Sequence, residues 1–352
     1  MEETKAKAPK RSLGEKILGL SDSNMLLLIT IVVFVIMYIF AMAVLQKGFL
    51  TGQGFLNILN NNAYLIILAC GLSIVMITGG IDISVGGVTG LITMCCAVWL
   101  DKQGGSLIGS MALAVGIGLE FCIIQGYLVA YLEIQPFIVT LAGMFFARGL
   151  TTIINTDPFN VVNPDFVNLK DTKIIIPGLG SVNRRGVYID AYIEVGVIIA
   201  LIVVVLLFLM LKYTKLGRAF YAVGGNNQSA LMLGINVKRT KFFAQLLCGL
   251  MAGIGGYVYF THVGSGSVLN ATGAEMNAIA SSIIGGTMLT GGVGNIIGTF
   301  FGVISLGTIK DIVTSAGFEQ SWWTGITVAA MLCFFIVIQS IIIKVKTRNK
   351  KK

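Results

Sequence analysis

The sequence is poor in charge and in the residues that build metal or nucleotide sites. Only 12% of its 352 residues are charged, about half the share of a typical soluble domain. The single histidine, His262, excludes a multi-histidine metal centre, and the chain has no GxxxxGK[ST] loop to cradle a nucleotide. The six cysteines lie in apolar runs without a CxxC pair, a pattern typical of small buried residues. We therefore expect no metal, no cofactor and no enzymatic centre in this chain.

The sequence is rich in long hydrophobic runs. With 55% hydrophobic residues and a mean hydropathy of +0.87, the chain is predicted to be an all-α polytopic membrane protein. Ten runs are long enough, or nearly so, to cross about 30 Å of hydrocarbon. We place them near 25–45, 56–78, 83–101, 106–132, 136–156, 190–211, 241–262, 275–291, 294–313 and 322–343. Glycine-rich breaks separate the second run from the third and the eighth from the ninth, so these pairs are either full spans or broken, re-entrant helices.

Basic residues predict the orientation. Most of the 25 lysines and arginines fall in an N-terminal tail over 1–24, a connection over 212–241 and a basic tail over 344–352. An even number of spans places all three segments, and both termini, on one side, which the positive-inside rule makes cytoplasmic. One transmembrane domain then covers 25–343. Because the bilayer explains the positive charge, we expect no nucleic-acid partner.

Two connections are longer than a turn. The external segment 157–189 contains three prolines and short β-like pieces, typical of either a small external structure or an ordered loop without a partner. In the cytoplasmic segment 212–241, Asn226 or Asn227 is predicted to cap a short helix that Gly234 ends, after a sharp turn at Gly224-Gly225. That helix either rests on lipid or docks a cytoplasmic partner.

Two ionisable residues are predicted to lie deep in the membrane. Glu120 and Arg148 each stand 12 residues from the inner end of adjacent antiparallel spans, roughly 18 Å above the inner surface. We expect them to pair, because a pair reduces the cost of leaving either charge alone in a low dielectric. The pair would fasten the helix hairpin or contact a solute.

Neutral polar residues are the candidates for a solute pathway, since hydroxylated solutes need donors and acceptors rather than ions. The candidates are Asn57, Asn60, Asn61, Asn62, Gln125, Thr140, Asn277, Ser281 and Ser282. Hydrogen bonding between helices is an equally good explanation for them.

Asp82 stands inside the apolar stretch GGIDISVGGVTG, residues 79–90. The span count places it at the cytoplasmic turn between the second and third runs. There we expect its carboxylate to cap the next helix by accepting backbone N–H groups near Ser84 and Val85. The alternative is that Asp82 and Ser84 form part of a gate at the inner mouth. The stretch resembles GGTMLTGGV, residues 285–293, which indicates a possible internal repeat.

Four motifs, in order along nearly the whole chain, carry a family resemblance. They are GGIDISVGGVTG (79–90), QPFIVTLAGMFFARGL (135–150), LGRAFYAVGGNNQSALMLGI (216–235) and AEMNAIASSIIGGTMLTGGVGNIIGTFFG (274–302). Through them the chain resembles the permease subunits of bacterial ABC importers for monosaccharides, the ribose/galactose/galactofuranose permease family. The details AGMFFARG and SWWT (321–324) look most similar to a galactofuranose-type permease.

The resemblance implies a pathway subunit of the bacterial cytoplasmic (inner) membrane with several partners. These are a cytoplasmic ABC ATPase, a periplasmic or lipid-anchored sugar-binding protein, and a second permease subunit, identical or related. It also implies that the cytoplasmic segment contacts the ATPase through Gly217, Arg218, Gly224, Gly225, Asn226, Ala230, Gly234 and Ile235.

An ion-coupled secondary carrier or channel for a small polar solute is the alternative function. A carrier would favour buried carboxylates in its pathway as proton or ion sites. The sequence offers one clearly deep carboxylate, Glu120, with Arg148 as its expected partner.

Overall fold

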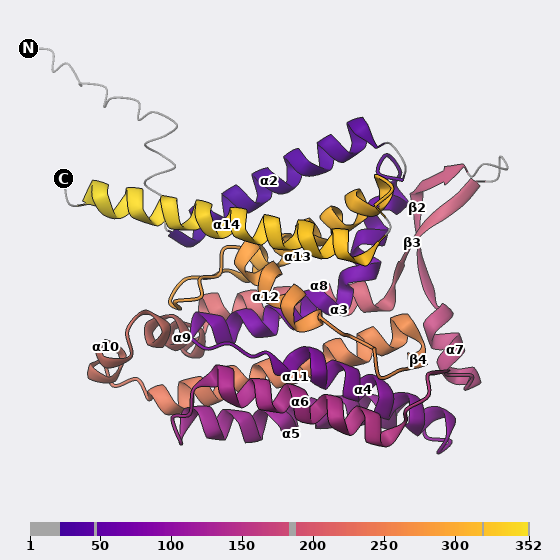
Figure 1. Ribbon diagram of the computed structural model, residues 1–352, viewed down its shortest axis with the longest axis horizontal. Helices are drawn as coiled ribbons and strands as arrows, with labels where there is room; N and C mark the ends of the chain where they lie inside the picture. The colour runs from indigo at the N-terminus through magenta and orange to yellow at the C-terminus, as the bar shows by residue number, and fades with distance from the viewer. Residues whose placement is uncertain (1–21, 46–47, 183–187, 319, 351–352) are drawn as a thin grey trace, which may run out of the picture.

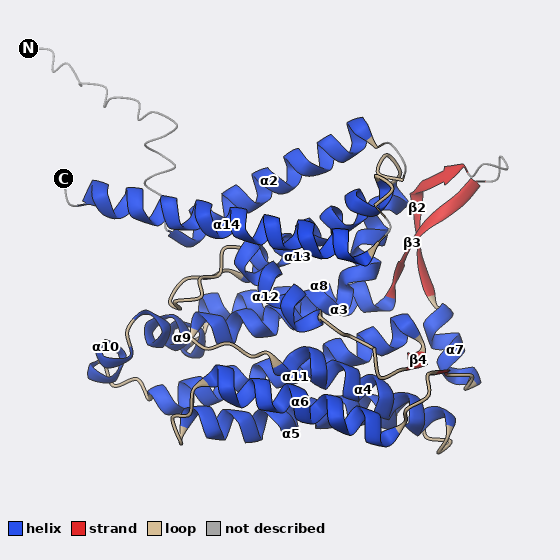
Figure 2. Ribbon diagram, viewed as in Figure 1, coloured by secondary structure: helices blue, strands red, loops and turns tan. Residues whose placement is uncertain are grey.

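The computed structural model describes residues 22–45, 48–182, 188–318 and 320–350. Most of the predicted tail over 1–24, and Lys351 and Lys352 of the predicted basic tail, lie outside the described residues. Long helices run side by side across the molecule, with small strands at one end (Figures 1 and 2). Helices α9 and α10 lie at the opposite end, on the side where the described chain begins and ends (Figure 1). This arrangement confirms the predicted all-α polytopic fold.

In the described part of the chain, nine helices are long and apolar enough to cross a membrane. They are α2 (Asp22–Val44), α3 (Gly52–Ile77), α4 (Ser84–Asp101), α5 (Leu107–Ala130), α6 (Pro136–Ile154), α8 (Val195–Tyr213), α11 (Val237–Val263), α13 (Ile296–Ser315) and α14 (Ser321–Lys350). Shorter helices are α7 (Pro164–Asp171), α9 (Lys215–Gly225), α10 (Asn227–Met232) and α12 (Ala274–Ile284). Strand β1 (Phe159–Asn160) pairs with β4 (Ser265–Gly266), and β2 (Lys173–Val182) pairs with β3 (Tyr188–Glu194), both antiparallel.

Helix α3 forms the centre of the bundle. It packs against α8, α11, α12 and α13, and nearly all its residues from Leu56 to Ile77 are buried. A helix that is apolar on every face is stable only where every face is covered. The pair α5 and α11 lies beside it at very close range, because Gly118 meets the backbone of Gly249 and Gly253 directly.

Of the two alternatives predicted for the eighth run, 275–291, the structure has the broken helix rather than a full helical span. Helix α12 has 11 residues, so it extends only about 16 Å and ends inside the membrane. Residues 285–295 continue to the cytoplasmic side without helical structure, where the N–H of Gly292 donates to the carbonyl of Ile77 at 2.8 Å. Helix α12 and residues 285–295 together complete the tenth crossing. The number of crossings is therefore even, as the prediction that both termini lie on one side requires. The second run is a full helix, whereas the third crossing combines a non-helical stretch, residues 80–83, with α4.

Helix α12 needs partners for its last carbonyl groups, because a helix end in hydrocarbon has no water to bond. Two lipid-side helices supply them. Thr30 of α2 donates its hydroxyl to the carbonyl of Ile284 at 2.7 Å, and Gln339 of α14 donates its amide to the carbonyl of Ile283 at 2.6 Å. Both side chains are buried. The outer helices α2 and α14 are therefore held to the core by the broken helix.

The external segment carries more structure than a loop. The predicted sixth span begins at residue 190, but β3 continues to Glu194 and α8 starts at Val195. Backbone groups of Tyr192 bond to the side chain of Gln53 on α3, with the N–H donating at 2.8 Å. At the other end of the molecule, α14 continues as helix through the predicted tail to Lys350. Its 30 residues extend about 45 Å, so its basic end projects beyond the hydrocarbon.

We predict that Thr30→Val destabilises the protein by about 1–3 kcal/mol, because the buried carbonyl of Ile284 loses its donor. The substitution keeps the side-chain volume, so packing is unchanged. Thr327→Val on α14 is the control, since the Thr327 hydroxyl bonds only within its own helix, to the carbonyl of Trp323 at 2.8 Å. Thermal unfolding in detergent measures both. Equal unfolding temperatures for the two variants would contradict the role of Thr30.

Candidate functional site

Asp82 lies deeper than the sequence predicts. Gly80 is level with Pro136, the first residue of α6, whereas Ser84 contacts Gly143, seven residues further along that helix. The chain therefore climbs about 10 Å into the bundle between Gly80 and Ser84. The prediction that Asp82 occupies the cytoplasmic turn is wrong, because the turn lies at Thr78 and Gly79 and residues 80–83 return into the membrane as a non-helical stretch before α4 begins.

Four donors surround the Asp82 carboxylate, which is fully buried. One oxygen accepts the backbone N–H of Ser84 at 2.8 Å and its hydroxyl at 2.6 Å. The other accepts the amide of Gln245 on α11 and the thiol of Cys122 on α5, the latter at 3.8 Å. The expected bond to the Ser84 N–H is present, although the formal cap position is Ile83. Asp82 thus ties the start of α4 to two other helices.

The other pathway candidates are spread over the molecule rather than gathered in one cavity. Thr140 is buried and donates to the carbonyl of Pro136 at 2.9 Å, and Ser281 is buried on α12. Asn277 is half-buried on the same helix, and Asn61 is exposed on α3. Asn60 is buried at the external end, where it joins α3 to β3. The set therefore does not form a single polar site in this structure.

The predicted pair of Glu120 and Arg148 is wrong. Arg148 donates to the carbonyl groups of Asn270 and Ala271, at 2.6 and 2.8 Å, in the segment just before α12. Its nearest counter-charge is Glu275 at the start of α12. Glu120 is exposed on α5 and lines a cavity of 550 Å³ between α4, α5 and α6. Glu120 and Arg148 do not meet, although they were predicted to lie at the same depth, because their side chains leave α5 and α6 toward different neighbours.

Glu275 was not among the sequence candidates. It is buried, and its carboxylate packs against Gly86 on α4. An acidic residue inside the run AEMNAIASS was the available signal, because a carboxylate in an apolar segment calls for a specific partner.

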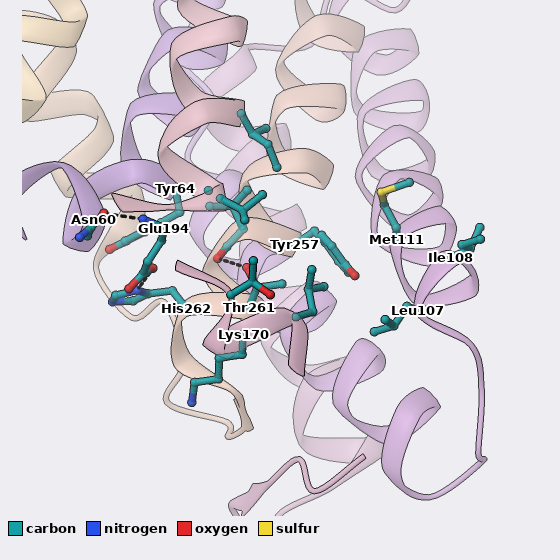
Figure 3. Close-up of a pocket in the computed structure, with 16 residues that line it drawn as sticks. Asn60, Tyr64, Leu107, Ile108, Met111, Lys170, Glu194, Tyr257, Thr261 and His262 are labelled. Carbon is teal, nitrogen blue, oxygen red and sulfur yellow. Dashed lines mark hydrogen bonds and ion pairs between the residues drawn. The ribbon is translucent and has the colours of Figure 1, made fainter. Parts of the chain in front are cut away.

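The external end of the bundle contains a cavity of 320 Å³ (Figure 3). The polar residues in its wall are Asn60, Lys170, Thr172, Glu194, Thr261 and His262, and the aromatic ones are Tyr64 and Tyr257. His262 Nδ1 and Glu194 Oε2 are 2.7 Å apart, and the Glu194 N–H donates to Asn60 at 3.0 Å. The wall therefore combines hydrogen-bonding groups with aromatic faces.

The cytoplasmic segment forms two helices, of which the sequence predicted the second. The side chain of Asn226 accepts the N–H of Ser229 at 2.9 Å and caps α10, as expected. Gly234 follows with φ 78°, which confirms it as the residue that ends the helix. Ala230 is buried and receives the N–H of Ile235 at 3.0 Å. Residues 231–233, between Ala230 and Gly234, form the tip of the cytoplasmic segment. Their apolar side chains are exposed, Leu231 to 58%, Met232 to 88% and Leu233 to 77%.

Helix α9 is capped by Thr214, whose hydroxyl accepts the N–H of Gly217 at 3.0 Å. Gly217 packs directly on the backbone of Leu211 at the end of α8, and Arg218 is exposed. Burial raises the pKa of Tyr221 to about 12, so its hydroxyl stays protonated and donates to the carbonyl of Gly294 at 3.0 Å. Helix α9 is therefore fixed to the membrane domain on two sides.

A cleft of 330 Å³ lies next to α10 on the cytoplasmic face. Its wall includes Glu133, Lys238 and Lys241. Lys238 Nζ and Glu133 Oε1 are 2.9 Å apart and join the α5–α6 turn to the start of α11. The hydrogen bond and charge of Lys238 lower the pKa of the Glu133 carboxyl, which therefore stays ionised at neutral pH.

Three glycine pairs meet where α9 reaches the membrane domain. A methyl group on Gly224 would overlap the carbonyl of Ile77 and lie 2.6 Å from the nitrogen of Gly292. One on Gly291 would lie 2.9 Å from both the carbonyl of Gly224 and the nitrogen of Gly79. We call this meeting point of Gly79, Gly224, Gly291 and Gly292 the glycine junction. It brings both broken crossings into backbone contact with the cytoplasmic segment.

We predict that Asp82→Asn lowers the stability by less than Asp82→Ala. Asparagine keeps one oxygen for Ser84, and Gln245 can turn its amide to accept from the new NH₂ group. Alanine leaves several buried donors without an acceptor, at a cost of about 1–3 kcal/mol for each. Thermal unfolding of the purified variants measures the difference. Equal loss in both would show that the negative charge itself, rather than the acceptor oxygens, holds this region together.

Comparison with known proteins identifies the family. Residues 54–336 match the family described as branched-chain amino acid transport system / permease component. The inner membrane ABC transporter permease YjfF of Escherichia coli is 35% identical over 90% of this chain and 92% of its own. The fructose import permease FruG of Bifidobacterium longum is 36% identical over 97% and 96%, respectively.

The ribose import permease RbsC of Escherichia coli is 31% identical over 84% of this chain and 88% of its own. No solved structure matches the chain significantly. The family match and the relatives cover the membrane helices, both broken crossings and the cytoplasmic segment together. The chain therefore belongs to this family of ABC transporter permease components, multi-pass proteins of the bacterial inner membrane.

Proposed function

We propose that this chain forms the transmembrane pathway of an ATP-driven importer for a monosaccharide. Relatives that match it over most of its length are named as fructose and ribose import permeases. An ABC permease works with an ATPase and a substrate-binding protein, and we add a second permease subunit, identical or related, as the other half of the pathway. The observation that carries the proposal is an exposed apolar tip joined through the glycine junction to both broken crossings.

The tip fits an ATPase subunit as its occupant. Helix α10 lies at the end of the molecule that the basic segments place in the cytoplasm (Figure 1), and Leu231, Met232 and Leu233 at its end are exposed. Three adjacent exposed apolar side chains on a water-facing tip are typical of an interaction site. The cleft beside α10, with its charged wall, lies next to the tip and gives a partner a second surface to engage.

The glycine junction connects the tip to the membrane helices, so that a movement of the tip can displace them. Helix α9 touches the end of α3 through Gly224 and touches the 285–295 segment at Gly292. Beyond these points lie Asp82 on one crossing and α12 on the other. A displacement of α9 by the ATPase would therefore shift both broken crossings together, which is what alternating access requires.

The external cavity suits the outer part of a sugar pathway. Its 320 Å³ falls at the lower end of the range for small-molecule pockets. Tyr64 and Tyr257 offer aromatic faces, and Asn60 and Thr261 offer hydroxyl-matching groups. The galactofuranose-type specificity stays a prediction, since permeases with this scaffold are named for fructose, ribose and autoinducer 2.

The carrier alternative would use buried carboxylates, and the structure has two, Asp82 and Glu275, in place of the expected Glu120. Hydrogen-bond donors from Ser84, Gln245 and Cys122 surround Asp82, and Arg148 is the counter-charge of Glu275. The Asp82 carboxylate is thus occupied by structural contacts, whereas Oε2 of Glu275 is buried without a hydrogen-bond partner among the described residues. The names of the relatives, which are import permeases, therefore favour the ATP-driven function.

We predict that reconstituted vesicles holding the chain with its ATPase and binding protein take up sugar only when ATP reaches the ATPase. Met232→Glu should abolish ATP-dependent uptake and co-purification of the ATPase, because a charge replaces the apolar contact. Leu269→Glu is the control, since Leu269 is 78% exposed on the external side. Uptake driven by an ion gradient without the ATPase would overturn the proposal in favour of the carrier.

We predict that Gly224→Ala abolishes transport while Gly225→Ala leaves it near wild type. The two glycines are adjacent on α9, but only the methyl group at position 224 meets the backbone of Ile77 and Gly292; at 225 it meets open space. Uptake and thermal unfolding are measured together. If both variants transport equally well, the glycine junction does not couple the ATPase to the membrane helices.

A further inference from the structure

The cytoplasmic boundary of the bundle holds a cavity of 530 Å³ that is separate from the external cavity proposed for the sugar. It lies between the first turns of α2, the last turn of α8, α9 and the start of α13. Its floor is apolar, and two cations, Lys212 and Arg218, stand at its rim. We propose that this cavity binds the phosphate headgroup of an anionic phospholipid of the inner leaflet. The proposal does not depend on which solute is transported.

The charges at the rim favour an anion. Lys212 Nζ lies over the rings of Phe208 and Tyr213, 5.4 and 5.3 Å from their centroids. Arg218 donates to the carbonyl of Tyr213 at 3.5 Å. Among side chains that the structure describes, no carboxylate forms an ion pair with either cation. Two exposed cations beside one cavity therefore leave a positive potential for a ligand to neutralise.

The backbone around the cavity adds to this potential. Helix α13 begins here, with the side chain of Asn295 accepting the N–H of Ile297 at 2.9 Å. The positive end of a 20-residue helix favours a negative charge in front of its first turn. The carbonyl of Gly294 is already engaged, because Tyr221 and Ser23 both donate to it, at 3.0 and 3.3 Å.

The floor favours a lipid over a soluble anion. Leu27, Phe208, Leu211 and Ile297 form the apolar part of the wall and belong to membrane-spanning helices. Basic pockets between helices on the cytoplasmic side are typical binding sites for anionic headgroups. A free phosphate ion would gain nothing from this floor, whereas the glycerol and upper acyl carbons of a phospholipid would cover it.

The chain segment before α2 is a weaker candidate for the same cavity. Residues 1–21 carry five basic and three acidic side chains, so their net charge has the same sign as Lys212 and Arg218. Charge complementarity therefore selects the phospholipid. Because Arg218 and Tyr221 belong to α9, a bound lipid would brace the helix that leads to the glycine junction.

The test titrates phosphatidylglycerol and phosphatidylcholine onto the purified full chain and counts bound lipid by native mass spectrometry. Wild type should retain phosphatidylglycerol in preference to phosphatidylcholine. The double variant Lys212→Gln/Arg218→Gln should bind phosphatidylglycerol roughly 25-fold more weakly, at about fivefold for each cation near the membrane surface. The control Lys215→Gln/Arg239→Gln removes two exposed cytoplasmic cations outside the cavity wall and should leave binding unchanged.

A second variant keeps both charges. Ile297→Trp fills the cavity and should abolish the preference for phosphatidylglycerol. The proposal therefore remains testable even if the charge variant fails to fold. Inorganic phosphate is the competing probe. Displacement of phosphatidylglycerol by phosphate at equal concentration would show a soluble-anion site and overturn the proposal. Equal lipid binding by wild type and both cavity variants would overturn it as well.

Discussion

Backbone polar groups inside a bilayer must find partners in the protein, and the two broken crossings depend on this constraint. A continuous helix satisfies it by itself, whereas each break exposes N–H or carbonyl groups where no water reaches them. At the first break, Asp82 receives the N–H of Ser84 that begins α4. At the second, Thr30 and Gln339 donate to the carbonyl groups of Ile284 and Ile283 at the end of α12. The three side chains that make these bonds come from the stretch before α4, from α2 and from α14, so the breaks hold the bundle together.

This constraint changes the interpretation of polar residues within the spans. Thr30, Gln339, Thr140 and Arg148 all donate to backbone carbonyls rather than lining a common channel. Thr30 and Gln339 support the end of α12, Arg148 supports the segment before it, and Thr140 also reaches the carbonyl of Ile81 before α4 at 3.4 Å. These polar side chains therefore support breaks in the helices, and a solute pathway must be sought in cavities that have polar walls, such as the external one near His262.

Features that depend on local chemistry could be predicted from the sequence. Hydropathy found nine of the crossings, and the Asn226 cap with Gly234 at the helix end followed from short-range rules. The glycine-rich sequence made a broken eighth run one of two alternatives, but the position of the break at the end of α12 could not be predicted, because 275–291 is apolar whether or not it is helical. The partner of Arg148 was missed for another reason. Depth in the membrane follows from residue number, but the neighbour that a long side chain meets depends on helix rotation and on a distant segment, 264–273. Each glycine pair could be seen in the sequence, but only the fold shows that the pairs are in contact.

The glycine junction has a consequence for the energetics of motion. Where packed side chains separate two segments, sliding one past the other forces many rotamers to rearrange, and the interface then resists small displacements. At Gly224, Gly291 and Gly292 there are no side chains to rearrange, and the segments touch as bare peptide planes. No rotamer has to change for a displacement of one backbone to reach the other, and the hydrogen bond from the Gly292 N–H to the carbonyl of Ile77 joins two of the segments. Movement of α9 is therefore passed to both crossings instead of being absorbed by side chains at the contact.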